Sequence, residues 1–144
     1  MDVKELMQGA FTTAKKKGWW DKGKRKTVLE CLMMAVTELG EAVEELRTPT
    51  LPPIYQIQIQ YDGEAICVTP QDKCYYRETG EVYTRFKFKW DPGIKPEGWV
   101  IEIADCLIRL ADTCAHEKVD LVKALELKMA YNKMRDYRHG NKKY

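Results

Sequence analysis

The chain has 144 residues, an apolar fraction of 44% and a net charge of +2. This length suits one domain with a real hydrophobic core, and the small net charge excludes a global attraction to nucleic acid or membranes. No apolar run approaches the roughly 20 residues of a membrane span, and the N-terminus lacks the apolar stretch of a signal peptide. We therefore expect a single soluble domain, residues 1–144, in the cytoplasm, with its five cysteines reduced and inside the core.

The first part of the chain predicts two helices. Residues 2–17 place their apolar side chains on one helical stripe, with Asp2 as the N-cap. A second helix is predicted over residues 27–47, because a capping pattern opens it and Pro49 ends it. The first half of this helix, residues 28–36, is apolar nearly all round, so we expect it to be deeply packed.

Residues 54–90 have a different pattern, which predicts a small antiparallel meander. In residues 55–61, apolar or aromatic side chains alternate with glutamines, as in a strand with one apolar face. Turn sequences at residues 62–63 and 78–81 predict two hairpins. The last strand would present one apolar face made of Val82, Thr84, Phe86, Phe88 and Trp90.

Helical patterns return in the last third of the chain, at residues 97–116 and from Asp120 to about residue 137. The predicted order is therefore helix, helix, small sheet, helix, helix. We expect a mainly α fold, a helical bundle with the β-meander inserted between the second and third main helices. The meander would shape access to the site or lie at a subunit interface, without supplying metal ligands.

Two pairs of carboxylates define the candidate site. Glu38 and Glu41 are three residues apart on the second helix, and Glu102 and Asp105 repeat this spacing on the third. Each pair shares one helix face, and the third helix is apolar in nearly every other direction, so its acidic line should be buried. Buried like charges repel and are costly to desolvate, and a divalent cation relieves both penalties. Carboxylates without histidine suit Mg²⁺, with Mn²⁺ as a possible substitute, rather than zinc or a di-iron centre.

These two motifs resemble the ExxE and ExxD motifs of MazG-like nucleoside triphosphate pyrophosphohydrolases, an all-α family related to dimeric dUTPases. Further stretches are similar to small bacterial and phage members of this family, and they are residues 18–21, 95–98, 131–135 and 138–142. The resemblance covers about two thirds of the chain. Members usually join the two carboxylate helices by a short connection, and residues 54–90 depart from that pattern.

The resemblance implies a homodimer or homotetramer with Mg²⁺ held by Glu38, Glu41, Glu102 and Asp105. It also implies hydrolysis of a (deoxy)nucleoside triphosphate to the monophosphate and pyrophosphate. A carboxylate that is not fully committed to the metal can accept a proton from the attacking water, and either Glu41 or Glu45 is the candidate.

The candidate substrate contacts lie outside the carboxylate helices. Lys128, Asn132 and Arg135 fall on one face of the last helix, which favours phosphate binding, and Lys142 follows in the tail. The indole rings of Trp19 and Trp20 offer flat surfaces for a base, although core packing explains them equally well. The two lone histidines, His116 and His139, are interpreted as structural or surface residues.

Two other functions are compatible with the pattern. Residues 86–90 alternate aromatic and cationic side chains, as in single-strand nucleic-acid binding surfaces, but a half-buried strand has the same alternation. The chain is alternatively a helical assembly module without catalysis. The paired carboxylates favour the hydrolase over both alternatives.

Overall fold

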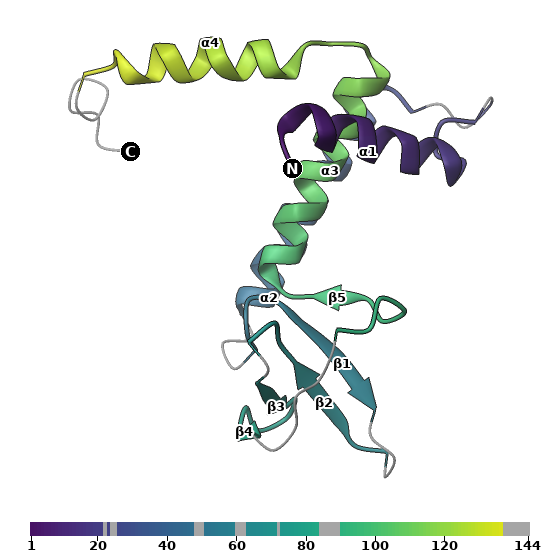
Figure 1. Ribbon diagram of the computed structural model, residues 1–144, viewed down its shortest axis with the longest axis vertical. Helices are drawn as coiled ribbons and strands as arrows, with labels where there is room; N and C mark the ends of the chain where they lie inside the picture. The colour runs from purple at the N-terminus through teal and green to yellow at the C-terminus, as the bar shows by residue number, and fades with distance from the viewer. Residues whose placement is uncertain are drawn as a thin grey trace. The chain divides into compact units, whose positions relative to one another are not determined.

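The computed structural model describes residues 1–21, 23, 26–47, 51–59, 63–71, 73–83 and 90–136. Figure 1 shows the helices and strands, whose order in the chain agrees with the prediction. None of the helices in the described ranges is long and apolar enough to cross a membrane. The elements are α1 (Val3–Lys16), α2 (Val28–Leu46), β1 (Tyr55–Ile59), β2 (Ala65–Val68), β3 (Cys74–Tyr76), β4 (Val82–Tyr83), β5 (Pro96–Glu97), α3 (Trp99–His116) and α4 (Leu121–Lys133).

The chain divides into two compact units. One contains residues 1–28 and 108–144, and the other contains residues 29–107. The first unit therefore holds α1, α4 and the C-terminal part of α3, and the second holds almost all of α2, the strands and the N-terminal part of α3. Because α3 continues through the boundary, the expectation of a single domain stays a prediction.

Caps fix the starts of two helices, as the sequence predicts. The carboxylate of Asp2 accepts a hydrogen bond from the backbone N–H of Glu5, whose side chain accepts one from the N–H of Asp2. This reciprocal pair satisfies two of the donors that the first turn of α1 leaves open. At α4, the side chain of Asp120 accepts from the N–H of Lys123 in the same way.

The strands form one five-stranded sheet in the order β4-β3-β2-β1-β5, which Figure 1 shows within the second unit. Antiparallel pairing of β1 with β2, β2 with β3, and β3 with β4 confirms the predicted meander. Strand β5 was not predicted; it pairs Pro96 with Gln56 and Glu97 with Tyr55. The predicted strand residues 84–89 lie outside the described ranges.

The alternating pattern marks the Tyr55 and Ile59 face of the sheet as apolar, but this face is buried at the Tyr55 end and exposed at the Ile59 end. Ile59 is 77% exposed, whereas the side chain of Gln56 is only 2% exposed. The amide of Gln56 donates to the carbonyls of Asp91 and Ile94 and accepts from the N–H of Asp91, so its burial leaves no polar atom unsatisfied. The core cluster lies on the Gln56 face and consists of Ile66, Val68 and Cys74.

The prediction of an all-α helical bundle with an appended meander is wrong. The sheet belongs to the same compact unit as most of α2, and β5 leads directly into α3. The hydroxyl of Tyr55 on β1 donates to the carboxylate of Glu45 on α2 at 3.0 Å, which ties the sheet to the helix. The second unit is therefore a mixed α and β structure. Hydrogen bonds such as Tyr55 to Glu45 join the meander to the helices, and hydrophobic periodicity in the sequence does not reveal such bonds.

The prediction that residues 28–36 are deeply packed is also wrong. Cys31 and Ala35 are buried, but most of the large side chains in this range are exposed. A continuous apolar composition shows that a helix can be buried on every side. It does not show that partners on every side exist within the chain.

We predict that Gly98→Ala destabilises the fold, because Gly98 has φ +108 and a Cβ there would collide with the carbonyl of Pro53. That carbonyl accepts the N–H of Val100 at the start of α3, so the backbone has little room to move. We expect a loss of about 1–3 kcal/mol in the free energy of unfolding, measured by urea denaturation. The control is Gly40→Ala, where the added Cβ meets nothing within 4 Å and the helix should tolerate or gain from it. Equal stability of the two variants would contradict this account.

Candidate metal centre

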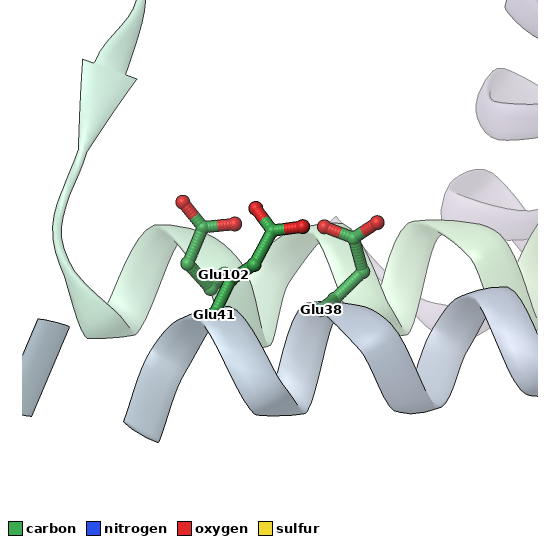
Figure 2. Close-up of side chains that lie close together, drawn as sticks. All are labelled: Glu38, Glu41 and Glu102. Carbon is green, nitrogen blue, oxygen red and sulfur yellow. The ribbon is translucent and has the colours of Figure 1, made fainter. Parts of the chain in front are cut away.

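Helices α2 and α3 bring three carboxylates together. Each of Glu38, Glu41 and Glu102 offers one oxygen, and these oxygens lie within 4.8 Å of one another. Figure 2 shows the two helices side by side, with the three carboxylates pointing the same way. We call these residues the acidic cluster. The two ExxE-type motifs therefore converge as the sequence predicts, for three of the four residues.

The acidic cluster is buried at its base and open on one side. Glu38 is 5% exposed and Glu102 is 4% exposed, whereas Glu41 is exposed. The buried carboxylates are held by the helices, and the exposed one faces solvent. This is the arrangement that a bound cation needs if a ligand from solution is to reach it.

The electrostatics of the acidic cluster are unfavourable without a cation. Burial raises the pKa of Glu102, and the charges of Glu41, Asp105 and Glu38 raise it further, while Lys95 lowers it. Within the part of the chain described, no hydrogen bond or ion pair reaches the Glu102 carboxylate. A buried carboxylate among like charges with no direct partner is the observation that points to a missing positive charge.

Asp105 lies one turn further along α3 and is half-buried. Its oxygens are not part of the mutual 4.8 Å group, although its charge acts on Glu102. The structure therefore brings together Glu38, Glu41 and Glu102, and the role of Asp105 as a fourth ligand stays a prediction.

The two candidate bases, Glu41 and Glu45, have different surroundings. The carboxylate of Glu45 accepts a hydrogen bond from the hydroxyl of the buried residue Tyr55. Burial and this hydrogen bond raise the pKa of Tyr55 well above its usual range. Glu45 is thus held by a contact between α2 and the sheet. Glu41 is exposed beside the other two carboxylates, so it is better placed to exchange a proton with a bound water.

The two tryptophans, both in the first unit, differ in their freedom. The indole N–H of Trp20 donates to Asp112 at 2.9 Å, and its ring stacks on His116 with centroids 3.7 Å apart. Trp20 is therefore committed to α3 as a packing residue. Trp19 is 51% exposed, and the ammonium of Lys26 lies 4.6 Å from its ring centroid, so this indole still has accessible surface.

Two of the proposed phosphate contacts, Lys128 and Asn132, lie on α4 in the first unit, and Arg135 follows the C-cap Met134. The helix was predicted to reach about residue 137 but ends at Lys133, so Arg135 does not continue its face. Lys128, Asn132 and Arg135 are exposed, and the cations of Lys128 and Arg135 lie within 6 Å of the Tyr131 ring. Lys142 and His139 lie outside the described residues. Their part in substrate binding stays a prediction.

Sequence reasoning missed two residues near the acidic cluster. Lys95 acts on Glu102 through its charge, and Tyr55 fixes Glu45. Tyr55 stood in the alternating strand pattern, which marked it only as a core side chain. Lys95 lies in a segment that the resemblance had already picked out, and its position just before an acidic helix was the available signal.

The donor set fits a hard divalent cation. Three carboxylates supply oxygen ligands, and no histidine or cysteine belongs to the group. Mg²⁺ is commonly bound through a few carboxylates and keeps several waters, which suits an open cluster with one exposed member. Mn²⁺ accepts the same ligands.

We predict that Glu102→Gln stabilises the protein in metal-free buffer and changes its pH dependence. Since the folded-state pKa of Glu102 is raised, the native state holds a proton that the unfolded state has lost. The loss of folding stability that this causes begins near pH 4.5, the ordinary pKa of a glutamate. It grows as the pH rises toward the folded-state pKa of Glu102 and reaches its full size above that pKa. Thermal unfolding in a chelator should therefore show the variant more stable at neutral pH and no less stable at pH 4. Identical pH profiles of the two proteins would contradict the burial of a charge here.

Comparison of the chain with protein families, with curated proteins and with solved structures finds no match in any of the three. The functional conclusion therefore depends on the residues of the acidic cluster and on the motifs that they carry.

Proposed function

We propose that the protein is a Mg²⁺-dependent hydrolase that converts a (deoxy)nucleoside triphosphate to the monophosphate and pyrophosphate. The observation that supports this most directly is the acidic cluster with its buried Glu102, whose carboxylate has no hydrogen bond or ion pair among the described residues. The resemblance of both carboxylate motifs to those of MazG-like pyrophosphohydrolases supplies the reaction. Neither the motifs nor the acidic cluster requires an all-α fold.

In this proposal Glu38 and Glu102 are the fixed ligands, Glu41 completes the set, and Asp105 is the fourth candidate. Bound magnesium would neutralise phosphate charge and acidify a coordinated water. Glu41 accepts the proton of the attacking water, because it is the exposed member of the cluster. Glu45 is the weaker candidate for that role, since its carboxylate already accepts the hydroxyl of Tyr55.

The substrate contacts in the proposal are cations and one accessible indole. Lys95 lies within electrostatic range of Glu102 in the same unit, so it can offset the negative charge that a triphosphate brings to the cluster. Lys128, Asn132, Arg135 and Lys142 remain proposed phosphate contacts. Trp19 is the candidate for stacking on a base. Trp20 is not, because its ring already stacks on His116.

The proposal includes a homodimer or homotetramer acting in the cytoplasm. Four of the five cysteines are buried, which suits a reducing compartment in which thiols serve as small apolar core residues. Of the two alternatives, nucleic-acid binding rested on residues 86–90, of which the structure describes only Trp90. A silent assembly module does not require three carboxylates to converge.

The test is a panel of ribo- and deoxyribonucleoside triphosphates with Mg²⁺, with products separated by chromatography. We expect monophosphate and pyrophosphate, and loss of both in a chelator. Glu102→Gln should lower kcat/KM by at least about 100-fold, because it removes a charged ligand from the cluster. The matched control is Glu44→Gln, an exposed carboxylate on α2, the helix that carries Glu38 and Glu41, and it pairs with Arg47. Turnover without metal, or full activity of Glu102→Gln, would refute the proposal.

A further inference from the structure

Glu45 lies on the same face of α2 as the two glutamates that this helix gives to the acidic cluster. At about 100° per residue, Glu45 is turned only roughly 20° from Glu38 and roughly 40° from Glu41 around the helix axis. It is also one turn beyond Glu41, at the spacing at which side chains on a helix are neighbours. Spacing alone would therefore make Glu45 a further ligand for a cation bound in the cluster.

The structure directs the Glu45 carboxylate to the sheet instead. It accepts a hydrogen bond from the hydroxyl of Tyr55 at 3.0 Å, and it is not part of the group whose oxygens lie within 4.8 Å of one another. Among the described residues, the carboxylates that raise the pKa of Glu102 are those of the cluster and Asp105. The charge of Glu45 raises the pKa of Tyr55 and Cys67, which both lie on the sheet. Glu45 thus belongs electrostatically to the sheet.

Tyr55 is a rigid and lasting donor for this hydrogen bond. The residue is 2% exposed on β1, so its ring is held by the packing around it. Burial, the hydrogen bond to Glu45 and the charge of Glu97, which lies opposite on β5, raise the pKa of Tyr55 well above its usual range. The phenol therefore keeps its proton in neutral solution and remains a donor to Glu45.

Glu45 needs such a donor because it lies in the last turn of α2. This turn has no basic residue, and the C-terminal end of a helix carries partial negative charge that disfavours a carboxylate. Tyr55 gives Glu45 a partner on the sheet, so this carboxylate is satisfied without a cation. Glu102 differs, because its carboxylate has no hydrogen bond or ion pair within the described ranges.

We propose that Tyr55 is a positioning residue that withholds Glu45 from the acidic cluster and so limits the number of carboxylates around a bound divalent cation. Mg²⁺ is octahedral and is usually held by a few carboxylates together with waters and substrate phosphates. A further carboxylate would take a position that a phosphate oxygen or the attacking water needs, and its charge would repel the phosphate. The inference rests on the metal site of the proposed function and adds the residue that sets its ligand number.

The test is a titration of each variant with Mn²⁺, in which electron paramagnetic resonance measures the free ion. Tyr55→Phe keeps the buried ring but removes the donor, so Glu45 can turn toward Glu41 and the ion. We expect the Kd for Mn²⁺ to fall at least about threefold, because more carboxylate charge then surrounds the ion. A merely structural role of Tyr55 predicts the opposite, since a loosened helix would bind the ion more weakly.

A second substitution shows whether Glu45 causes the tighter binding. Tyr55→Phe/Glu45→Gln has no carboxylate to release, so it should bind Mn²⁺ no more tightly than Glu45→Gln alone. The matched control is Tyr75→Phe, the same change at a half-buried tyrosine of β3 whose hydroxyl makes no hydrogen bond among the described residues, and it should keep the wild-type Kd. With a nucleoside triphosphate as substrate, Tyr55→Phe should raise KM, and adding Glu45→Gln should restore it.

A single substitution keeps the test decisive if Tyr55→Phe does not fold. Glu45→Gln should leave the Kd for Mn²⁺ within about twofold of the wild type, whereas Glu41→Gln should raise it at least about tenfold. A loss in Glu45→Gln as large as that in Glu41→Gln would show that Glu45 is already a ligand, which overturns the inference.

The remaining outcomes separate this inference from the proposed function. Unchanged or weaker Mn²⁺ binding by folded Tyr55→Phe would overturn the inference alone, and so would tighter binding that persists in the double variant. Mn²⁺ binding with the expected differences but without nucleotide hydrolysis would overturn the proposed function and support the role of Tyr55. A wild type that binds no Mn²⁺ at millimolar concentration would overturn both.

Discussion

The constraint on which the second unit depends is the repulsion among three carboxylates that two helices hold in place. Glu38 and Glu102 are almost fully buried, and Figure 2 shows their helices, α2 and α3, side by side. Burial raises the pKa of Glu102 and the neighbouring carboxylates raise it further, although Lys95 opposes the shift, so this point of the fold carries an electrostatic cost. A cation that binds the folded protein at this point would offset the cost and stabilise the fold.

Contacts of the sheet and its connections fix the ends of the two carboxylate helices. Tyr55 holds Glu45 at the C-terminal end of α2, and Gly98 lets the chain pass the Pro53 carbonyl as it enters α3. The hydrogen bonds of Gln56 attach residues 91–94 to the sheet, and α3 follows directly after. The ends of the two carboxylate helices are thus fixed by polar contacts in the segment that joins them, and none of the described residues of this segment supplies a carboxylate to the cluster.

Local chemistry in the sequence predicted much of this structure. The caps of Asp2 and Asp120 and the shared helix face of Glu38 and Glu41 depend on spacing within one element, and the hairpin order depends on turn residues between neighbouring strands. Both kinds of pattern are visible in a sequence. The tertiary arrangement was not predictable in the same way. Periodicity identified Gln56 as an outward residue because it cannot show the carbonyls that its amide reaches. It likewise assigned residues 28–36 to a core, because it counts apolar side chains and not the neighbours available to cover them.

The arrangement of residues around α2 has a consequence for how this helix can change over generations. Its buried residues, such as Ala35 and Glu38, and its exposed apolar residues, such as Leu32 and Leu39, keep a fixed angle to each other around the helix axis. Inserting or deleting one residue between Leu32 and Glu38 would turn one half of the helix by about 100° against the other. Carboxylates and apolar surface would then no longer face their separate directions. Substitutions at exposed positions such as Thr37 leave the angle intact, so α2 should accumulate changes of residue type while its length stays constant or changes by sevens.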